Sequence, residues 1–267
     1  MLIPVRTQIK YYKLSDSWDN SNSPVTTAVG TESNSFTGTF DGNGKTLNVN
    51  ISDTSNQGTA PFRHIKDGAV IKNLTTAGSV TGTTHASGLV GFSVDGSAEA
   101  PNTIDNCIVN VAVSVTSASG DLHMGGVVGH GVMSYLKIKD TVFSGTMTNK
   151  GSYAGGLQGW SDGNHLTIEN CLFKGSYSGS GLFHPIAIHN NGSNTTFSGS
   201  NNYYTAEPNF SSSGYIITSA AKVYESAPLG SITETVTAAD GNTYYKVTGY
   251  EVVTTISTAY IHLNSIP

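Results

Sequence analysis

The sequence has little of what marks the commoner functional classes. Charged residues make up only 12% of its 267 residues, and the formal net charge is −5. A chain so weakly charged and mildly acidic offers no basic patch for nucleic acid and no basic face for a membrane surface. It also has no apolar run of about 18 residues, so we expect no membrane insertion.

Signatures of common enzyme and cofactor classes are missing as well. The chain contains no Gly-x-x-x-x-Gly-Lys-Ser/Thr loop for a nucleotide phosphate. It contains no Gly-x-Ser-x-Gly nucleophile elbow either. These absences argue against nucleotide-dependent and serine-hydrolase chemistry, and we expect no cofactor.

What the chain does contain is an internal repeat. Four segments share an isoleucine two residues before an Asn or Asp, and they begin at Ile71, Ile104, Ile138 and Ile168. A second element, two glycines flanking two other residues, recurs with the same period at 88–91, 126–129 and 156–159. Two signals that share a period of about 30–34 residues predict a repeat fold.

After each isoleucine, apolar and polar residues alternate, which is typical of half-buried strands. Residues two apart in a strand share a face, so aligned repeats give columns that we expect to point inward. These columns are Leu74, Cys107, Thr141 and Cys171; Thr76, Val109, Phe143 and Phe173; and Val80, Val113, Met147 and Tyr177. The 31 glycines argue against a helical solenoid, because glycine costs about 1 kcal/mol per helical position. The sequence therefore predicts an all-β solenoid.

Two further columns are polar, and we interpret both as structural ladders that set the register. One is expected to stack at a corner, where side-chain amides satisfy neighbouring backbone groups; it contains Asn73, Asn106, Asp140 and Asn170. The other alternates in charge and contains Lys72, Asp105, Lys139 and Glu169. With about 4.8 Å between coils, its members are candidate ion pairs worth about 0–1 kcal/mol each.

The two cysteines, Cys107 and Cys171, fall in one column with Thr141 between them. Two coils then separate them by about 9.6 Å. A disulfide needs Cα atoms within about 7 Å, so we predict two free, buried thiols. The pair therefore carries no information about compartment.

The glycine elements and the Ile-x-Asn corners, together with the segment from Phe36 to Leu47, resemble the GLUG-motif family of bacterial surface proteins. The resemblance covers about residues 11–205 and implies a right-handed, single-stranded parallel β-helix in a secreted or surface-attached protein, adhesins among them. The motif weakens at 60–63 and 181–184. The first residues hold no apolar run long enough for a signal peptide. The chain is then either a cytoplasmic protein or a fragment whose export signal lies elsewhere. Because the resemblance implies export, we expect the fragment, extracellular or at the cell surface.

Three regions are expected. Residues 1–35 form an N-terminal cap, because the open end of a β-helix exposes strand edges that would template aggregation. Residues 36–205 form the parallel β-helix of about five coils. Residues 206–267 form a small C-terminal β region, in which the turn at 239–242 joins a hairpin and residues 250–256 form a third strand. Whether this region is a separate domain or a cap on the helix stays open.

One column is a candidate ligand-binding surface. The residues that follow the glycine elements are His64, Phe92, His130 and Trp160, with Pro185 in the last coil. Aromatic faces suit the apolar C–H patches of sugar rings, so this stripe would bind a glycan or a host surface ligand. The alternative, which we favour, is that these rings pack over glycine-rich backbone.

No metal site is expected from His64, His130 and His184. Phe92 and Trp160 intervene between them, and ligation at about 2 Å needs direct neighbours. His123, near Asp121, is expected to lie in a solvated loop.

The sequence therefore predicts a noncatalytic, monomeric β-helix domain that acts as an adhesin-like binding surface or a rigid stalk. The alternative is a polysaccharide lyase or glycoside hydrolase, because similar β-helix scaffolds support both activities. A hydrolase needs two carboxyls about 5–9.5 Å apart. The acids here are scattered, with Asp95, Asp121 and Asp162 in turns, so we expect no catalytic residues.

Overall fold

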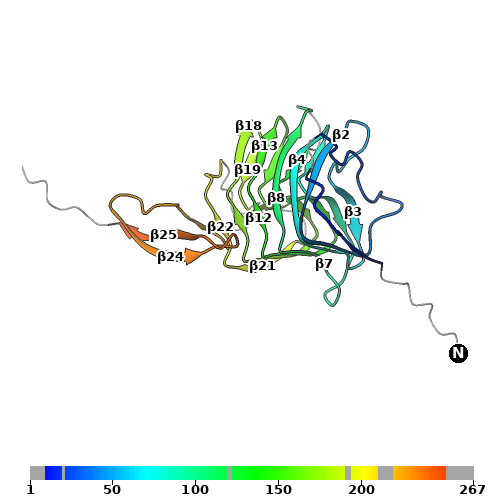
Figure 1. Cartoon of the computed structure of the whole chain (residues 1–267). Helices are drawn as coiled ribbons and strands as arrows, with labels where there is room; N and C mark the ends of the chain where they lie inside the picture. The colour runs from blue at the N-terminus through cyan, green and yellow to red at the C-terminus, as the bar shows by residue number, and fades with distance from the viewer. Residues whose placement is uncertain (1–9, 20–21, 119–121, 190–193, 210–218, 251–267) are drawn as a thin grey trace, which may run out of the picture.

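The computed structural model describes residues 10–19, 22–118, 122–189, 194–209 and 219–250. These residues form strands and turns without a helix, and the strands of successive repeats stack in parallel as a β-solenoid of about six turns (Figure 1). The expected all-β parallel β-helix is thereby confirmed. The described part of the chain has no helix long and apolar enough to cross a membrane.

Three parallel sheets form the walls of the solenoid, and a separate hairpin follows them. The 14-stranded sheet contains β1 (Tyr11–Lys13), β2 (Thr39–Asp53), β4 (Val70–Gly82), β7 (Asn102–Asp105), β8 (Ile108–Val115), β11 (Tyr135–Lys139), β12 (Val142–Phe143), β13 (Thr146–Asn149), β16 (His165–Glu169), β17 (Leu172–Phe173), β18 (Ser176–Gly179), β21 (Thr196–Ser200), β22 (Tyr203–Tyr204) and β23 (Ala221–Lys222). The five-stranded sheet contains β3 (Phe62–Lys66), β6 (Val90–Val94), β10 (Val128–Val132), β15 (Gln158–Asp162) and β20 (Ala187–His189). The four-stranded sheet contains β5 (His85–Ser87), β9 (His123–Gly125), β14 (Tyr153–Gly155) and β19 (Leu182–His184).

The expected register between repeats is confirmed. The four leading isoleucines are paired in sequence across β4, β7, β11 and β16, and all four are fully buried. The inward columns stack as predicted, and every member is buried except Tyr177, which is half-buried. Within one of them the rings of Phe143 and Phe173 stack with centroids 5.3 Å apart. The core is therefore a set of ladders that run along the solenoid.

The predicted asparagine ladder forms one corner of four successive turns, with positive φ at each of its members. The values are +53° at Asn73, +52° at Asn106, +49° at Asp140 and +50° at Asn170. Asn and Asp tolerate this left-handed conformation better than other side chains with a Cβ. Nδ2 of Asn106 donates to Oδ1 of Asn73 at 2.9 Å, and Nδ2 of Asn170 donates to Oδ1 of Asp140 at 2.7 Å. The ladder thus fixes backbone shape as well as register.

The charged column and the thiols also lie where the repeat placed them. Lys139 pairs with Asp105 at 3.0 Å, whereas Glu169 pairs at 2.7 Å with Lys137, which lies outside the predicted column. Cys107 and Cys171 are free and buried, and burial raises the pKa of each thiol to about 12. At neutral pH both cysteines are therefore uncharged and behave as small apolar residues.

The described part of the predicted N-terminal cap continues the solenoid. Strand β1 pairs in parallel with β2. Farther along, Trp18 and Val25 make parallel bridges to Leu47 and Val49 of the same strand. Residues 10–19 and 22–36 therefore add a partial turn to the N-terminal end of the stack, and this turn covers the edge of β2.

The C-terminal region contains the predicted hairpin, formed by β24 (Ser231–Thr237) and β25 (Thr243–Tyr250). It projects from one end of the solenoid (Figure 1). Its turn is held to the solenoid by an ion pair between Lys174 and Asp240 at 2.7 Å, and Tyr244 packs in a small cluster with Leu172. The predicted third strand lies outside the described residues, apart from Tyr250, which belongs to β25.

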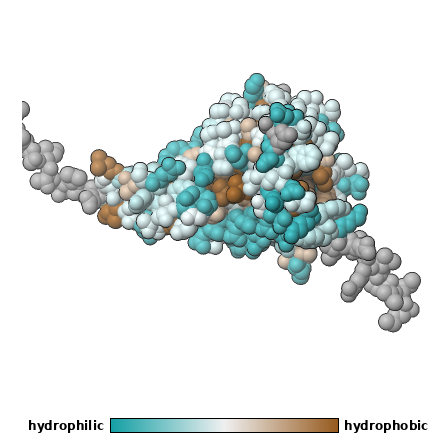
Figure 2. All heavy atoms as spheres, in the orientation of Figure 1, coloured by the Kyte–Doolittle hydropathy of each residue, from teal (hydrophilic) through white to brown (hydrophobic). Residues whose placement is uncertain are grey.

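The outer surface is mostly polar. Figure 2 shows one face on which hydrophobic residues are scattered, with a small group at the end of the hairpin that lies away from the solenoid. Two residues at that end, Leu229 and Ile232, are exposed. In the described solenoid, exposed large hydrophobic residues such as Trp18, Ile108 and Met133 are scattered, and the buried ones form the core of the stack.

The corner ladder yields a stability prediction at Asn106, which is exposed and has a φ of +52°. Both Asn106→Ala and Asn106→Gly remove the bond to Asn73, but only alanine is strained in this conformation. Asn106→Ala should therefore have a free energy of unfolding about 1 kcal/mol below that of Asn106→Gly. Urea denaturation measures the difference, with Asn110→Ala on the exposed face of β8 as a control. Equal urea midpoints for the two Asn106 variants would contradict the role of the corner.

Candidate functional site

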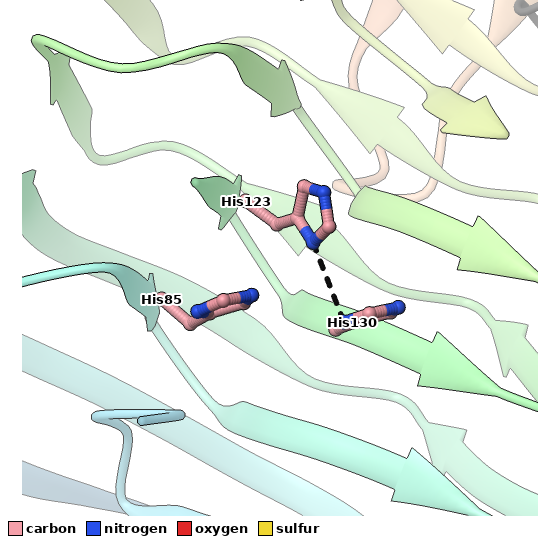
Figure 3. A group of neighbouring side chains, drawn as sticks. All are labelled: His85, His123 and His130. Carbon is pink, nitrogen blue, oxygen red and sulfur yellow. Dashed lines mark hydrogen bonds between the residues drawn. The ribbon is translucent and has the colours of Figure 1, made fainter. Parts of the chain in front are cut away.

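Three histidines lie together at a corner of the solenoid (Figure 3). His85 on β5 and His123 on β9 are register partners in adjacent turns. His130 lies on β10, seven residues after His123. One nitrogen of each ring lies within 4.8 Å of the others, and no second group of this kind occurs among the residues that the structure describes.

The glycine element between β9 and β10 brings His130 back beside His123. A Cβ on Gly125 would lie 1.8 Å from the carbonyl oxygen of Val128, so only glycine fits this tight reversal. The next residue, Gly126, is equally confined, since a Cβ there would lie 2.0 Å from the carbonyl oxygen of Gly156. The repeat that shapes the corner therefore also assembles the cluster.

The three rings are arranged edge to face and face to face. Nδ1 of His123 lies 3.3 Å from Nδ1 of His130, and these two rings are nearly perpendicular. The ring of His85 is parallel to that of His130, with centroids 5.8 Å apart, and perpendicular to that of His123 at 4.9 Å. His85 and His123 are buried, whereas His130 is partly exposed.

Burial keeps two of these imidazoles neutral. It lowers the pKa of His123 to about 2 and that of His130 to about 3, and repulsion from neighbouring histidines acts in the same direction. A neutral imidazole carries one N–H donor and one lone pair. Nε2 of His130 is buried and has no hydrogen-bond partner.

Aromatic rings enclose the cluster on two sides. The ring of Trp160 stacks on that of His123, with centroids 4.8 Å apart and planes within 5°. Phe92 lies 5.5 Å from both His85 and His130, and its ring also stacks on His64 at 4.7 Å. The histidines thus have aromatic neighbours on two sides, and His130 is the partly exposed member.

The predicted stripe of His64, Phe92, His130 and Trp160 is a true register column, because these residues pair in turn across β3, β6, β10 and β15. Phe92 and Trp160 are each only 9% exposed, so the stripe is largely packed and not an open aromatic surface. Placing Pro185 next in the column was wrong. The register pairs Gln158 with Ala187 and shifts before Ser161, so Pro185 lies ahead of β20.

The expected placement of His123 in a solvated loop was also wrong, because His123 is a buried residue of β9. Asp121 lies outside the described residues. Of the three histidines considered for a metal, only His130 belongs to the cluster. The sequence did hold the signal: His85 and His123 both stand three residues before the first glycine of their repeat element.

A groove of about 910 Å³ opens beside His64 and the edge of Phe92. One wall comes from the N-terminal partial turn and carries Thr31, Glu32, Ser33 and Ser35. The other lining residues are Ser55, Asn56, Gln57, Arg63, Lys66, Val94, Asp95 and Val132. Arg63 is held by an ion pair with Asp53, and Trp160 is not part of the lining. The groove therefore combines polar and apolar surface in about equal parts, with an aromatic edge.

Comparison with known proteins adds no assignment to this geometry. Neither a scan against protein-family models nor a search of curated proteins gives a match. Any function must therefore be argued from the chemistry of the cluster and the groove.

His184 yields a pH prediction. Its Nδ1 accepts a bond from the backbone N–H of Ile186, and burial lowers its pKa to about 4. An unfolded histidine has a pKa of about 6.5, so the unfolded chain takes up this proton first as the pH falls. Stability should be unaffected by this group above about pH 6.5 and should fall between about pH 6.5 and pH 4, by up to about 1.4 kcal/mol per pH unit.

The measurement compares urea midpoints of the wild type and His184→Asn from pH 8 to pH 4. The asparagine keeps an acceptor for Ile186 but has no titrating ring, so its midpoint should fall less steeply with pH. Any difference at pH 8 reports packing alone and serves as the reference. Parallel curves over the whole range would contradict the prediction.

Proposed function

We propose that this chain is a noncatalytic module of a bacterial cell-surface or secreted protein, a stiff rod that binds carbohydrate along its side. The observation that supports binding most directly is the groove beside His64 and Phe92. The glycine elements resemble those of GLUG-motif proteins, which is consistent with this proposal. Membership of that family is itself a part of what we propose.

The rod character follows from the way the turns are joined. Each inner strand bonds to the strands of the turns on both sides, and the buried columns continue from one turn to the next. Stability in such a stack comes from each turn and its neighbours, so the shape is set along the whole length. A stiff element of this kind can hold a binding groove away from a cell surface.

The groove has the size and chemistry that a short glycan needs. Its volume is within the range of about 300–1,000 Å³ that is usual for ligand pockets. Exposed polar side chains such as Glu32 and Gln57 can bond to sugar hydroxyls. The rings of His64 and Phe92, stacked on one another, supply the apolar contact.

A second candidate function rests on one observation, which is that Glu32 and Asp95 both line this groove. Glycoside hydrolysis needs two carboxyls about 5–9.5 Å apart, one of which acts as an acid. Two acids of the charged column are engaged elsewhere, since Asp105 pairs with Lys139 and Glu169 with Lys137 on strands of the large sheet. We retain binding as the proposed function and hydrolysis as its alternative.

Binding is tested on a glycan array with the wild type and with variants of two residues that line the groove. His64→Ala and Gln57→Ala should each weaken binding of the selected glycan more than tenfold, because both remove contacts in the groove. Asn110→Ala, on the exposed face of β8, should bind as the wild type does. If the wild type binds no glycan, or if both groove variants bind normally, the carbohydrate proposal fails.

Catalysis is tested by incubating the wild type with neutral and acidic polysaccharides. Reducing ends and the absorbance of unsaturated products are then measured. We expect no turnover above background. Turnover that is lost in both Glu32→Gln and Asp95→Asn would replace the noncatalytic function with the hydrolytic one. Asparagine suits position 95 because the φ there is +54°.

A further inference from the structure

We propose that His85, His123 and His130 form a binding site for one divalent transition-metal ion, with zinc as the best match to the donors. This site is separate from the carbohydrate function proposed above. It stands on the position, chemistry and surroundings of the three rings.

The spacing of the donors is close to that of a metal centre. Zinc binds histidine nitrogens at about 2.0–2.1 Å with tetrahedral geometry, which places two such nitrogens about 3.3–3.4 Å apart. Nδ1 of His123 and Nδ1 of His130 are 3.3 Å apart. All three donor nitrogens lie within 4.8 Å of one another. To bind one zinc ion, the most distant pair must therefore come closer by at most about 1.5 Å. Small side-chain rotations on fixed strands supply such a closure.

In the structure the Nδ1 atoms of His123 and His130 share one hydrogen bond, so one of the two carries a proton. Metal ions bind the neutral imidazole, and ligands that must first lose a proton bind more weakly at low pH. A shift of the proton from Nδ1 to Nε2 of the same ring frees the lone pair that a metal ion needs.

The surroundings also favour a site over a purely packed cluster. Nε2 of His130 is buried and unpartnered, whereas buried polar atoms are usually satisfied. It is the ring nitrogen opposite the Nδ1 donor, and it would carry the proton when that Nδ1 binds an ion. Trp160 stacks on His123 and Phe92 contacts the other two rings, so the donors are oriented before any ion arrives. His130 is the partly exposed member, and it marks the side from which an ion and a fourth ligand can enter.

The donor set narrows the class of ion. Imidazole nitrogens suit zinc, copper and nickel, whereas magnesium and calcium prefer oxygen ligands. Three protein ligands with a fourth position open to solvent are the arrangement of catalytic zinc sites, while structural sites are usually closed by four protein ligands. The geometry therefore points to an accessible ion with three protein donors.

The test uses the whole chain after removal of metal with a chelator. Titration with zinc chloride, followed by calorimetry, should show one ion per chain, and zinc should raise the thermal midpoint. His130→Gln and His123→Gln should each weaken zinc binding by about a hundredfold or more, because loss of an outer-shell partner alone costs about 10–100-fold. His165→Gln, an exposed histidine outside the cluster, should bind as the wild type does.

A second measurement covers the case in which His123→Gln does not fold. X-ray absorption of the zinc-loaded wild type should show three imidazole ligands, and cobalt should give the visible spectrum of a tetrahedral site. Absence of one-to-one binding in the wild type, fewer than three imidazoles, or unchanged affinity in folded His130→Gln would each overturn the proposal. In those cases the cluster is a packing feature of the corner.

Discussion

Backbone hydrogen bonds between successive turns are the constraint on which the rest of this structure depends. They fix the register, so a residue type that recurs once per repeat becomes a continuous column along the solenoid. Apolar columns then fill the interior, and polar columns lie outside or at corners. The same bonds leave unpaired edges at the two ends, where the N-terminal partial turn and the strands leading to the hairpin are found.

The corners of the solenoid are the places where side chains from different strands converge. Each turn must reverse direction within a few residues, and positive φ at residues such as Asn73 and Asn170 makes this possible. At another corner the glycine element brings the end of β9 beside the start of β10. Side chains from two strands and two turns then converge, which a flat wall does not allow. The histidine cluster is therefore a consequence of the same repeat that builds the core.

The repeat predicted the stack because both of its signals are local in the sequence. The alternation after Ile104 and the spacing to Ile138 are enough to predict which residues form the columns. They are also enough to predict that the two thiols lie too far apart for a disulfide. Convergence across a corner is different, because it depends on how sharply the glycine element folds back. For this reason the meeting of His85 with His130 was not predicted, nor was the shift near Trp160. The groove depends on where the N-terminal segment lies, which no repeat specifies.

Cysteine pairs on the exposed wall test the stacking most directly. Ala112 on β8 is the register partner of Thr146 on β13, and Thr146 is the partner of Ser176 on β18. All three are exposed, and the native thiols are buried. Under mild oxidation, the double variant Ala112→Cys and Thr146→Cys should form a disulfide, because adjacent strands are about 4.8 Å apart. Ala112→Cys with Ser176→Cys, about 9.6 Å apart, should not. Equal cross-linking of the two pairs, or cross-linking of the second alone, would contradict the stacked solenoid.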